Sequence, residues 1–82
     1  MKLIIASEAQ KQFSKLPKSE QKKVTKKLLV LETFPLSGKK LSGEFSGAYT
    51  LRSWPYRIIY SIDSSNQTTT VYSILHRQSA YS

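Results

Sequence analysis

From Lys39 onward the chain contains a set of cationic and phenolic side chains whose types suit phosphate chemistry. The set comprises Lys39, Lys40, Tyr49, Arg52, Tyr56, Arg57, His76, Arg77 and Tyr81. An arginine guanidinium binds two phosphate oxygens as a fork and stabilises the charge that develops at phosphorus. The tyrosines and Trp54 offer rings that stack on unpaired bases, which is how proteins commonly hold single-stranded RNA. These residue types therefore favour a site that binds or cleaves a phosphodiester chain.

Several other kinds of site are excluded by what the sequence lacks. It contains no cysteine, so disulfides, thiolate metal sites and cysteine nucleophiles are impossible. A single histidine and five scattered acidic residues predict neither a metal site nor the paired carboxylates of a glycosidase. There is no Gly-rich phosphate loop and no Gly-x-Ser-x-Gly nucleophile motif. We therefore expect no metal and no cofactor.

The charge of the chain points to a polyanionic partner. Thirteen basic residues against five acidic ones give a formal net charge of +8. Such a field favours nucleic acid or an acidic protein, and the alternative is a generically basic surface. No apolar run is long enough to span a membrane, and the N-terminal one is too short for a signal peptide. We expect a cytoplasmic protein with no membrane partner.

The elements that must position these residues follow from length and periodicity. Eighty-two residues make one domain, over residues 1–82. Two runs rich in aromatic and β-branched residues meet at Ser53-Trp54-Pro55 within 48–62, which predicts an antiparallel hairpin with Pro55 in the turn. We also expect a strand over 2–6, a helix from an N-cap at Ser7 (capping box with Gln10) to about 15, a helix from 18 or 19 to 33, a loop over 36–47 and a strand over 68–75. The fold class is therefore α+β, in the order β-α-α-β-β-β, with a helical hairpin on one face of a mixed sheet.

Strand alternation assigns side chains to the two faces of that sheet. In the hairpin, Arg57 lies opposite the apolar face formed by Ile58, Tyr60 and Ile62. In the last strand, alternation predicts Val71, Ser73, Leu75 and Arg77 on one side, with Tyr72, Ile74 and His76 on the other. Without a bulge, Arg57 and Arg77 both project from the open face. Two like charges placed together repel unless an anion binds between them.

Several of these residues also have an ordinary structural explanation. Tyr60 and Tyr72 alternate with isoleucine, which predicts that both belong to the core. Trp54 either caps the edge of the core or stacks on a base, and His76 either packs its strand or transfers a proton. Arg52 binds phosphate, pairs with Glu44 or lies over an aromatic ring. The lysines of the second helix form either a solvated face or a docking surface for phosphates or an acidic protein: Lys22, Lys23, Lys26 and Lys27.

Nearly the whole chain resembles the RelE/ParE superfamily of bacterial and archaeal toxins. The resemblance rests on Leu41-Ser-Gly, on the run from Tyr49 to Asp63 (Tyr-Thr-Leu-Arg-Ser-Trp-Pro-Tyr-Arg-Ile-Ile-Tyr-Ser-Ile-Asp), and on Ile74-Leu-His-Arg-Gln-Ser-Ala-Tyr81. The opening strand before Ser-Glu-Ala, the Leu-Pro before the second helix and the proline after it also fit. The similarity is to the RelE-like mRNA interferases above all, which implies a RelE-like fold.

The RelE branch implies a toxin that cleaves mRNA in the ribosomal A site without a metal, using the RNA's own 2′-hydroxyl as nucleophile. Carried over by position, the resemblance implies catalytic roles for Arg57, Arg77, Tyr81 and His76, with RNA or phosphate contacts at Lys39, Lys40, Arg52 and Trp54. RelE toxins have two lysines just before the strand's arginine, whereas this chain has Ala48 and Thr50. Lys39, Lys40 and His76 are the candidates to replace them.

Two alternatives remain open. The ParE branch shares the fold and poisons DNA gyrase by binding it, and a catalytically weak member would act as an antitoxin partner and regulator. In each case the resemblance implies a cognate antitoxin, acidic or helical, and a toxin–antitoxin complex that binds operator DNA.

Overall fold

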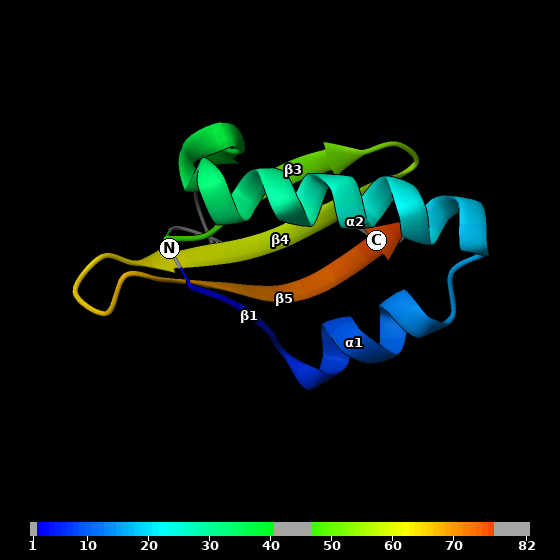
Figure 1. Cartoon of the computed structure of the whole chain (residues 1–82), viewed down its shortest axis with the longest axis horizontal. Coiled ribbons are helices and arrows are strands. Elements are labelled where there is room, and N and C mark those ends of the chain that lie inside the picture. The colour runs from blue at the N-terminus through cyan, green and yellow to red at the C-terminus, as the bar shows by residue number, and fades with distance from the viewer. Residues whose placement is uncertain (1, 41–46, 77–82) are drawn as a thin grey trace.

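Two helices cover one face of a five-stranded sheet, and no helix in the described part of the chain covers the other face, which we call the open face (Figure 1). The computed structural model describes residues 2–40 and 47–76. The elements are β1 (Lys2–Ile5), α1 (Ser7–Ser14), α2 (Lys18–Thr33), a 3-10 turn η1 (Pro35–Ser37), β2 (Lys39–Lys40), β3 (Tyr49–Ser53), β4 (Tyr56–Asp63) and β5 (Thr68–His76). The predicted fold class is confirmed. The two-residue strand β2 was not predicted, because a run this short has no periodicity to detect.

The strands are ordered β1-β5-β4-β3-β2. β1 runs parallel to β5, and the remaining neighbours are antiparallel. The hairpin between β3 and β4 turns at Trp54 and Pro55, as predicted. The helices therefore connect the edge strand β1 to the meander, and they pass over the sheet on the way (Figure 1).

The helix ends agree with the prediction for α2 and differ from it for α1. α2 spans Lys18–Thr33, with Pro17 before it and Phe34 after it. α1 is capped by Ala6 rather than by Ser7, and the cap makes no side-chain hydrogen bond. The Gln10 side-chain amide instead donates to the Ile5 carbonyl at 2.8 Å. The predicted capping box is therefore wrong, because the chain leaves β1 directly into the helix and Ser7 is already helical.

The core lies between the helices and the covered face of the sheet. Ala9 of α1 and Val24 and Leu31 of α2 are fully buried there. They pack with a set of strand residues that is buried almost as completely: Ile58, Tyr60, Val71 and Ile74. Val24 and Leu31 therefore mark the side of α2 that faces the sheet.

A β-bulge breaks the alternation of β5. Ile59 pairs with Ser73, but Tyr60 pairs with Val71, so Tyr72 is an extra residue. Val71 and Ile74 consequently both face the helices, and the predicted grouping of Val71 with Ser73 and Leu75 is wrong. Tyr72 is 48% exposed, so its predicted place in the core is wrong too. Its hydroxyl accepts a hydrogen bond from Ser61 Oγ at 3.1 Å.

Tyr60 joins the sheet to the segment that follows α2. Its hydroxyl donates to the Pro35 carbonyl at 2.8 Å and accepts from the Gly38 N–H at 3.0 Å. Its ring stacks on Tyr49, with centroids 5.5 Å apart. Burial has the larger effect on the pKa of Tyr60 and raises it, although the Gly38 hydrogen bond acts in the opposite direction. The phenol therefore keeps the proton that it donates. A Cβ at Gly38 would collide with this phenol and lie 2.6 Å from the Thr50 carbonyl, so only glycine fits there.

The turn between β4 and β5 is held by one carboxylate. Asp63 Oδ1 accepts from Ser65 Oγ at 2.7 Å and from the Asn66 N–H at 3.3 Å. Its Oδ2 accepts from Asn66 Nδ2 at 2.7 Å. These hydrogen bonds, that of the Ser65 side chain first, lower the pKa of Asp63.

We predict that Tyr60→Phe destabilises the fold by about 1–3 kcal/mol, because it leaves the Pro35 carbonyl and the Gly38 N–H without their partner. Urea unfolding followed by circular dichroism measures this change. Tyr72→Phe removes the same atom from an exposed ring and should shift the free energy of unfolding by less than about 0.5 kcal/mol. Equal effects of the two substitutions would contradict the role given to Tyr60.

We predict that Asp63→Ala lowers stability at neutral pH and that the difference from wild type disappears in acid. The folded-state pKa is lowered, so the stabilisation is present above the unfolded-state pKa and is lost as the pH falls through the folded-state pKa. Thermal unfolding across that pH range tests this. Ser64→Ala, in the same turn, is the control and should leave the pH dependence of wild type unchanged. A constant difference between Asp63→Ala and wild type would refute the prediction.

Candidate functional site

The open face of the sheet carries two arginines on neighbouring strands. Arg52 of β3 lies directly opposite Arg57 of β4, and Arg57 lies opposite Leu75 of β5. Directly opposed residues share a face, and their Cα atoms are about 4.5–5.5 Å apart. Ile58, next to Arg57, is fully buried under the helices, so both arginines belong to the other face. Like charges in this position destabilise a sheet, and a bound anion would relieve the repulsion.

The register of β2 separates the two lysines of the loop. Lys39 pairs with Thr50, and Lys40 pairs with Tyr49. Thr50 precedes Arg52 by two residues, so Lys39 is on the face that carries the arginines, whereas Lys40 is on the side of the helices. Strand spacing places the Cα atoms of Lys39 and Arg57 roughly 12 Å apart, a gap that two long side chains can bridge through a phosphate. Both lysines are exposed.

Thr50 is one of the two positions at which the resemblance leads us to expect a lysine. Its side chain is only 7% exposed. Among the residues that the structure describes, the Thr50 hydroxyl oxygen has no hydrogen-bond partner. Lys39 is its direct neighbour on the adjacent strand. The register thus places Lys39 next to Thr50, where the resemblance leads us to expect a lysine. Strand periodicity alone could not show this pairing.

His76 lies on the other side of the sheet from Arg57. It pairs with Tyr56, and the two rings meet edge to face with centroids 5.4 Å apart and planes at 88°. Tyr56 adjoins Arg57 in β4, so the histidine and the arginine point from opposite faces. The contact with Tyr56 agrees with the packing role that the sequence left open for His76.

Further cationic side chains line a depression between α2 and the β3–β4 turn. It is lined by Lys23, Lys26, Lys27, Val30, Arg52, Ser53 and Trp54. Trp54 is 59% exposed, so it does not seal the core edge. The sequence singled out the lysines of α2 and the Arg52/Trp54 pair separately. No sequence pattern joins them, because the contact arises only when α2 crosses the hairpin.

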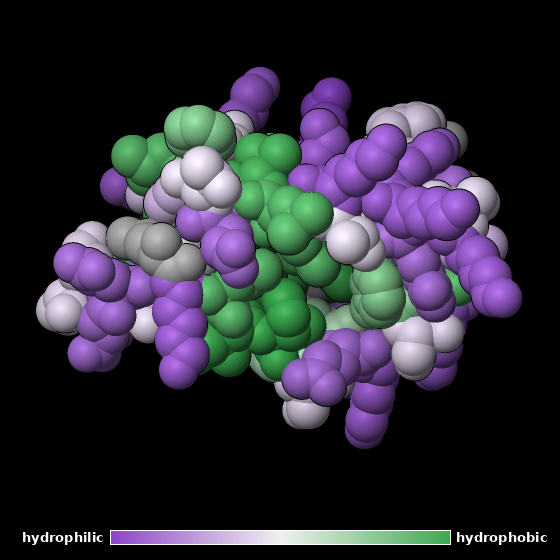
Figure 2. All heavy atoms as spheres, in the orientation of Figure 1, coloured by the Kyte–Doolittle hydropathy of each residue, from purple (hydrophilic) through white to green (hydrophobic). Residues whose placement is uncertain are grey.

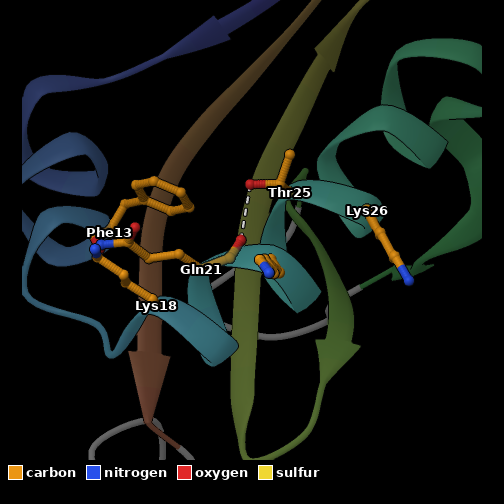
Figure 3. A pocket seen from close by; sticks show the side chains of 6 residues that line it. Phe13, Lys18, Gln21, Thr25 and Lys26 are labelled. Atoms are coloured by element: carbon orange, nitrogen blue, oxygen red, sulfur yellow. Dashed lines mark hydrogen bonds between the residues drawn. The ribbon is translucent and has the colours of Figure 1, made fainter.

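A second depression lies on the side of α2 that faces α1. Phe13, Lys18, Gln21, Lys22, Thr25 and Lys26 line it (Figure 3). Lys26 lines both depressions, so the basic face of α2 is continuous across the helix. The Thr25 hydroxyl is turned back onto its own helix, where it donates to the Gln21 carbonyl at 2.7 Å (Figure 3).

An apolar hollow separates the two helices. It is lined by Ile5, Gln10, Phe13, Leu28 and Ile74. Other exposed apolar side chains belong to the second half of α2 and the segment after it: Leu29, Val30, Phe34 and Leu36. Figure 2 shows a hydrophobic surface over the second half of α2 and the sheet below it, next to a strongly hydrophilic surface over the first half.

Two predicted catalytic residues, Arg77 and Tyr81, lie outside the described residues, as does Glu44, a predicted partner of Arg52. Neither helix in the described part of the chain combines the length and apolar character needed to cross a bilayer.

Comparisons with known proteins agree on one group of relatives. No curated protein matches the sequence significantly. Among solved structures, the fold is similar to the toxin–antitoxin complex RelBE2 from Mycobacterium tuberculosis (28% identity over 93% of this chain and 96% of that chain, TM-score 0.85). It is also similar to the intact RelBE toxin–antitoxin complex of E. coli (27% identity, 92% and 94% covered, TM-score 0.78). A YoeB/ParE toxin from Agrobacterium tumefaciens shares the fold at 18% identity (93% and 98% covered, TM-score 0.79).

The family model for the ParE toxin of the type II toxin–antitoxin system parDE matches residues 3–81, which is nearly the whole chain. The chain therefore belongs to the RelE/ParE family of type II toxin–antitoxin toxins.

Proposed function

We propose that this toxin is a ribosome-dependent endoribonuclease that cleaves mRNA in the cytoplasm without a metal ion. The observation that supports it most directly is the cluster of Lys39, Arg52 and Arg57 on the open face of the sheet. A metal-independent phosphodiester cleavage needs cations placed around the scissile phosphate, because negative charge increases there in the transition state.

In the proposed reaction, the 2′-hydroxyl oxygen of the RNA attacks the adjacent phosphorus and the bond to the 5′-oxygen of the next nucleotide breaks. The proton of the 2′-hydroxyl passes to a base, and the departing 5′-oxygen receives a proton from an acid. We assign Arg57 and Arg77 to binding the phosphate and stabilising its charge, and Tyr81 to proton transfer. His76 has the orienting role, since its contact with Tyr56 is on the face opposite Arg57.

Among the three candidates for the missing family lysine, we choose Lys39. It lies beside Thr50 and shares the face of Arg57, whereas Lys40 and His76 belong to the helix side. Its ammonium group would take part in stabilising the phosphate, with Arg52 and Trp54 contacting the RNA around it.

A cognate antitoxin is the proposed protein partner. The RelBE2 and E. coli RelBE neighbours were solved as toxin–antitoxin complexes. The apolar hollow between α1 and α2 and the net charge of +8 suit an acidic segment with an apolar stripe. The complex of the two proteins would then be the form that binds operator DNA.

A gyrase poison is the second candidate, and two observations favour it. The matching family model is that of ParE toxins, and Ala48 and Thr50 replace the lysines of RelE toxins. A catalytically weak toxin that acts through its antitoxin would share these features. Supercoiling by purified gyrase and induction of a DNA-damage response distinguish the gyrase poison from the ribonuclease.

The proposed function is tested by primer extension on ribosome-bound message after induction of the toxin. We predict codon-aligned cuts in wild type and a loss of cleavage rate of about 100- to 1,000-fold in Arg57→Ala, the range for removing one group that stabilises a transition-state charge. Growth arrest without such cuts, together with inhibited supercoiling, would establish the gyrase alternative. An inactive wild type whose antitoxin complex still binds operator DNA would support the regulator.

We predict that Lys39→Gln lowers the cleavage rate by about 100-fold, because it removes the cation beside the scissile phosphate. Lys40→Gln is the matched control, since it removes the same charge from the neighbouring residue on the other face and should change the rate far less. Single-turnover cleavage on programmed ribosomes measures both. A larger loss in Lys40→Gln than in Lys39→Gln would overturn the choice of Lys39.

A further inference from the structure

We propose that the depression between α2 and the β3–β4 turn is a second RNA-binding surface, which holds the backbone of single-stranded RNA and stacks an unpaired base on Trp54. This surface shares Arg52 and Trp54 with the RNA contacts proposed above and adds the lysines of α2, and it contains none of the residues assigned to the cleavage step. The inference relies on the proposed function only in taking RNA as the ligand, and its test requires binding and no cleavage.

Two of the three lysines of this surface carry charge that no described acidic residue neutralises. Lys23 pairs with Glu20 at 3.5 Å. Lys26 and Lys27 make no ion pair with any acidic residue in 2–40 and 47–76. Lys27 also lies one helical turn after Lys23 and Lys26 one turn after Lys22, and like charges at this spacing repel. A polyanion along α2 would remove that repulsion and release counterions.

Trp54 supplies the element that a purely electrostatic surface lacks. Its indole is 59% exposed at the hairpin tip and borders the same depression as the lysines. An aromatic ring beside a row of cations is the combination that binds single-stranded nucleic acid without sequence preference, because every base has a face that can stack. An acidic protein segment could also satisfy the lysines, and oligoglutamate in the experiment below distinguishes it from RNA.

Arg52 connects this surface to the open face of the sheet. It lines the depression beside α2, and in the hairpin it lies directly opposite Arg57. The lysines of α2, Trp54, Arg52 and Arg57 thus form a continuous basic path around the free end of the hairpin. A bound strand that follows this path reaches the proposed cleavage residues, which favours RNA over other polyanions.

Trp54 is the only tryptophan of the chain, so its fluorescence reports on this surface alone. The experiment titrates the full-length toxin with unlabelled oligoadenylate RNA at low salt, and with oligoglutamate of equal charge in parallel. We expect the RNA to quench the indole emission saturably and oligoglutamate to leave it nearly unchanged. Absence of quenching by RNA overturns the proposal, and equal quenching by oligoglutamate shows an acidic-protein surface instead.

The contribution of the lysines is measured by the salt dependence of RNA affinity in the double variant K26Q/K27Q. If each lysine contacts one phosphate, the slope of log K against log salt falls in magnitude by about 1.4, at about 0.7 per contact on a single strand. The variant K11Q/K15Q is the matched control, since it removes the same charge from exposed residues in the last turn and at the C-cap of α1. A smaller change in K26Q/K27Q than in this control overturns the proposal.

Failure of this inference is distinguishable from failure of the proposed function. A toxin that cleaves message on the ribosome while RNA leaves Trp54 unquenched loses only the second surface. A toxin that cleaves nothing but shows saturable quenching, reduced in K26Q/K27Q and retained in K11Q/K15Q, keeps the second surface and loses the ribonuclease assignment.

Discussion

The position of the proposed site depends on one buried phenol. Tyr60 belongs to the core, yet its hydroxyl bonds to both the Pro35 carbonyl and the Gly38 N–H. A buried hydroxyl must be satisfied, and these are the two groups available to it, so the segment after α2 is held against the sheet. Lys39 follows Gly38 directly, and its pairing with Thr50 begins where this anchor ends. A residue on the helix side of the sheet therefore sets the place of a cation on the open side.

The two faces of the sheet divide stability from proposed chemistry. The helix side contains the buried cluster and the contact between Tyr56 and His76, and the open side contains Arg52 and Arg57. Because neighbouring residues of a strand point to opposite faces, the register of each strand decides which cations meet. This separation allows a basic surface to form without placing charge in the core of a chain of only 82 residues.

Local signals in the sequence were sufficient for the main elements. The limits of α2 follow from Pro17 and Pro35, and the hairpin follows from alternation on both sides of Pro55. The sequence could not show the bulge at Tyr72, since an extra residue is accommodated by the pairing of two strands and has no marker in either strand alone. The same holds for the site. Residue types identified the cations. The choice of Lys39 over Lys40 and His76 depends on strand pairing, and the contact between the lysines of α2 and Trp54 depends on how the helix packs on the hairpin.

The short strand β2 has a further consequence for how the toxin behaves among copies of itself. In the strand order it lies at the edge of the sheet, where an unpaired backbone can recruit another chain. Within the described part of the chain this edge strand comprises Lys39 and Lys40, and both are exposed. Short, lysine-bearing edge strands oppose edge-to-edge pairing, because a second copy would bring like charges together. The two lysines of β2 are thus placed where they also oppose association through this edge.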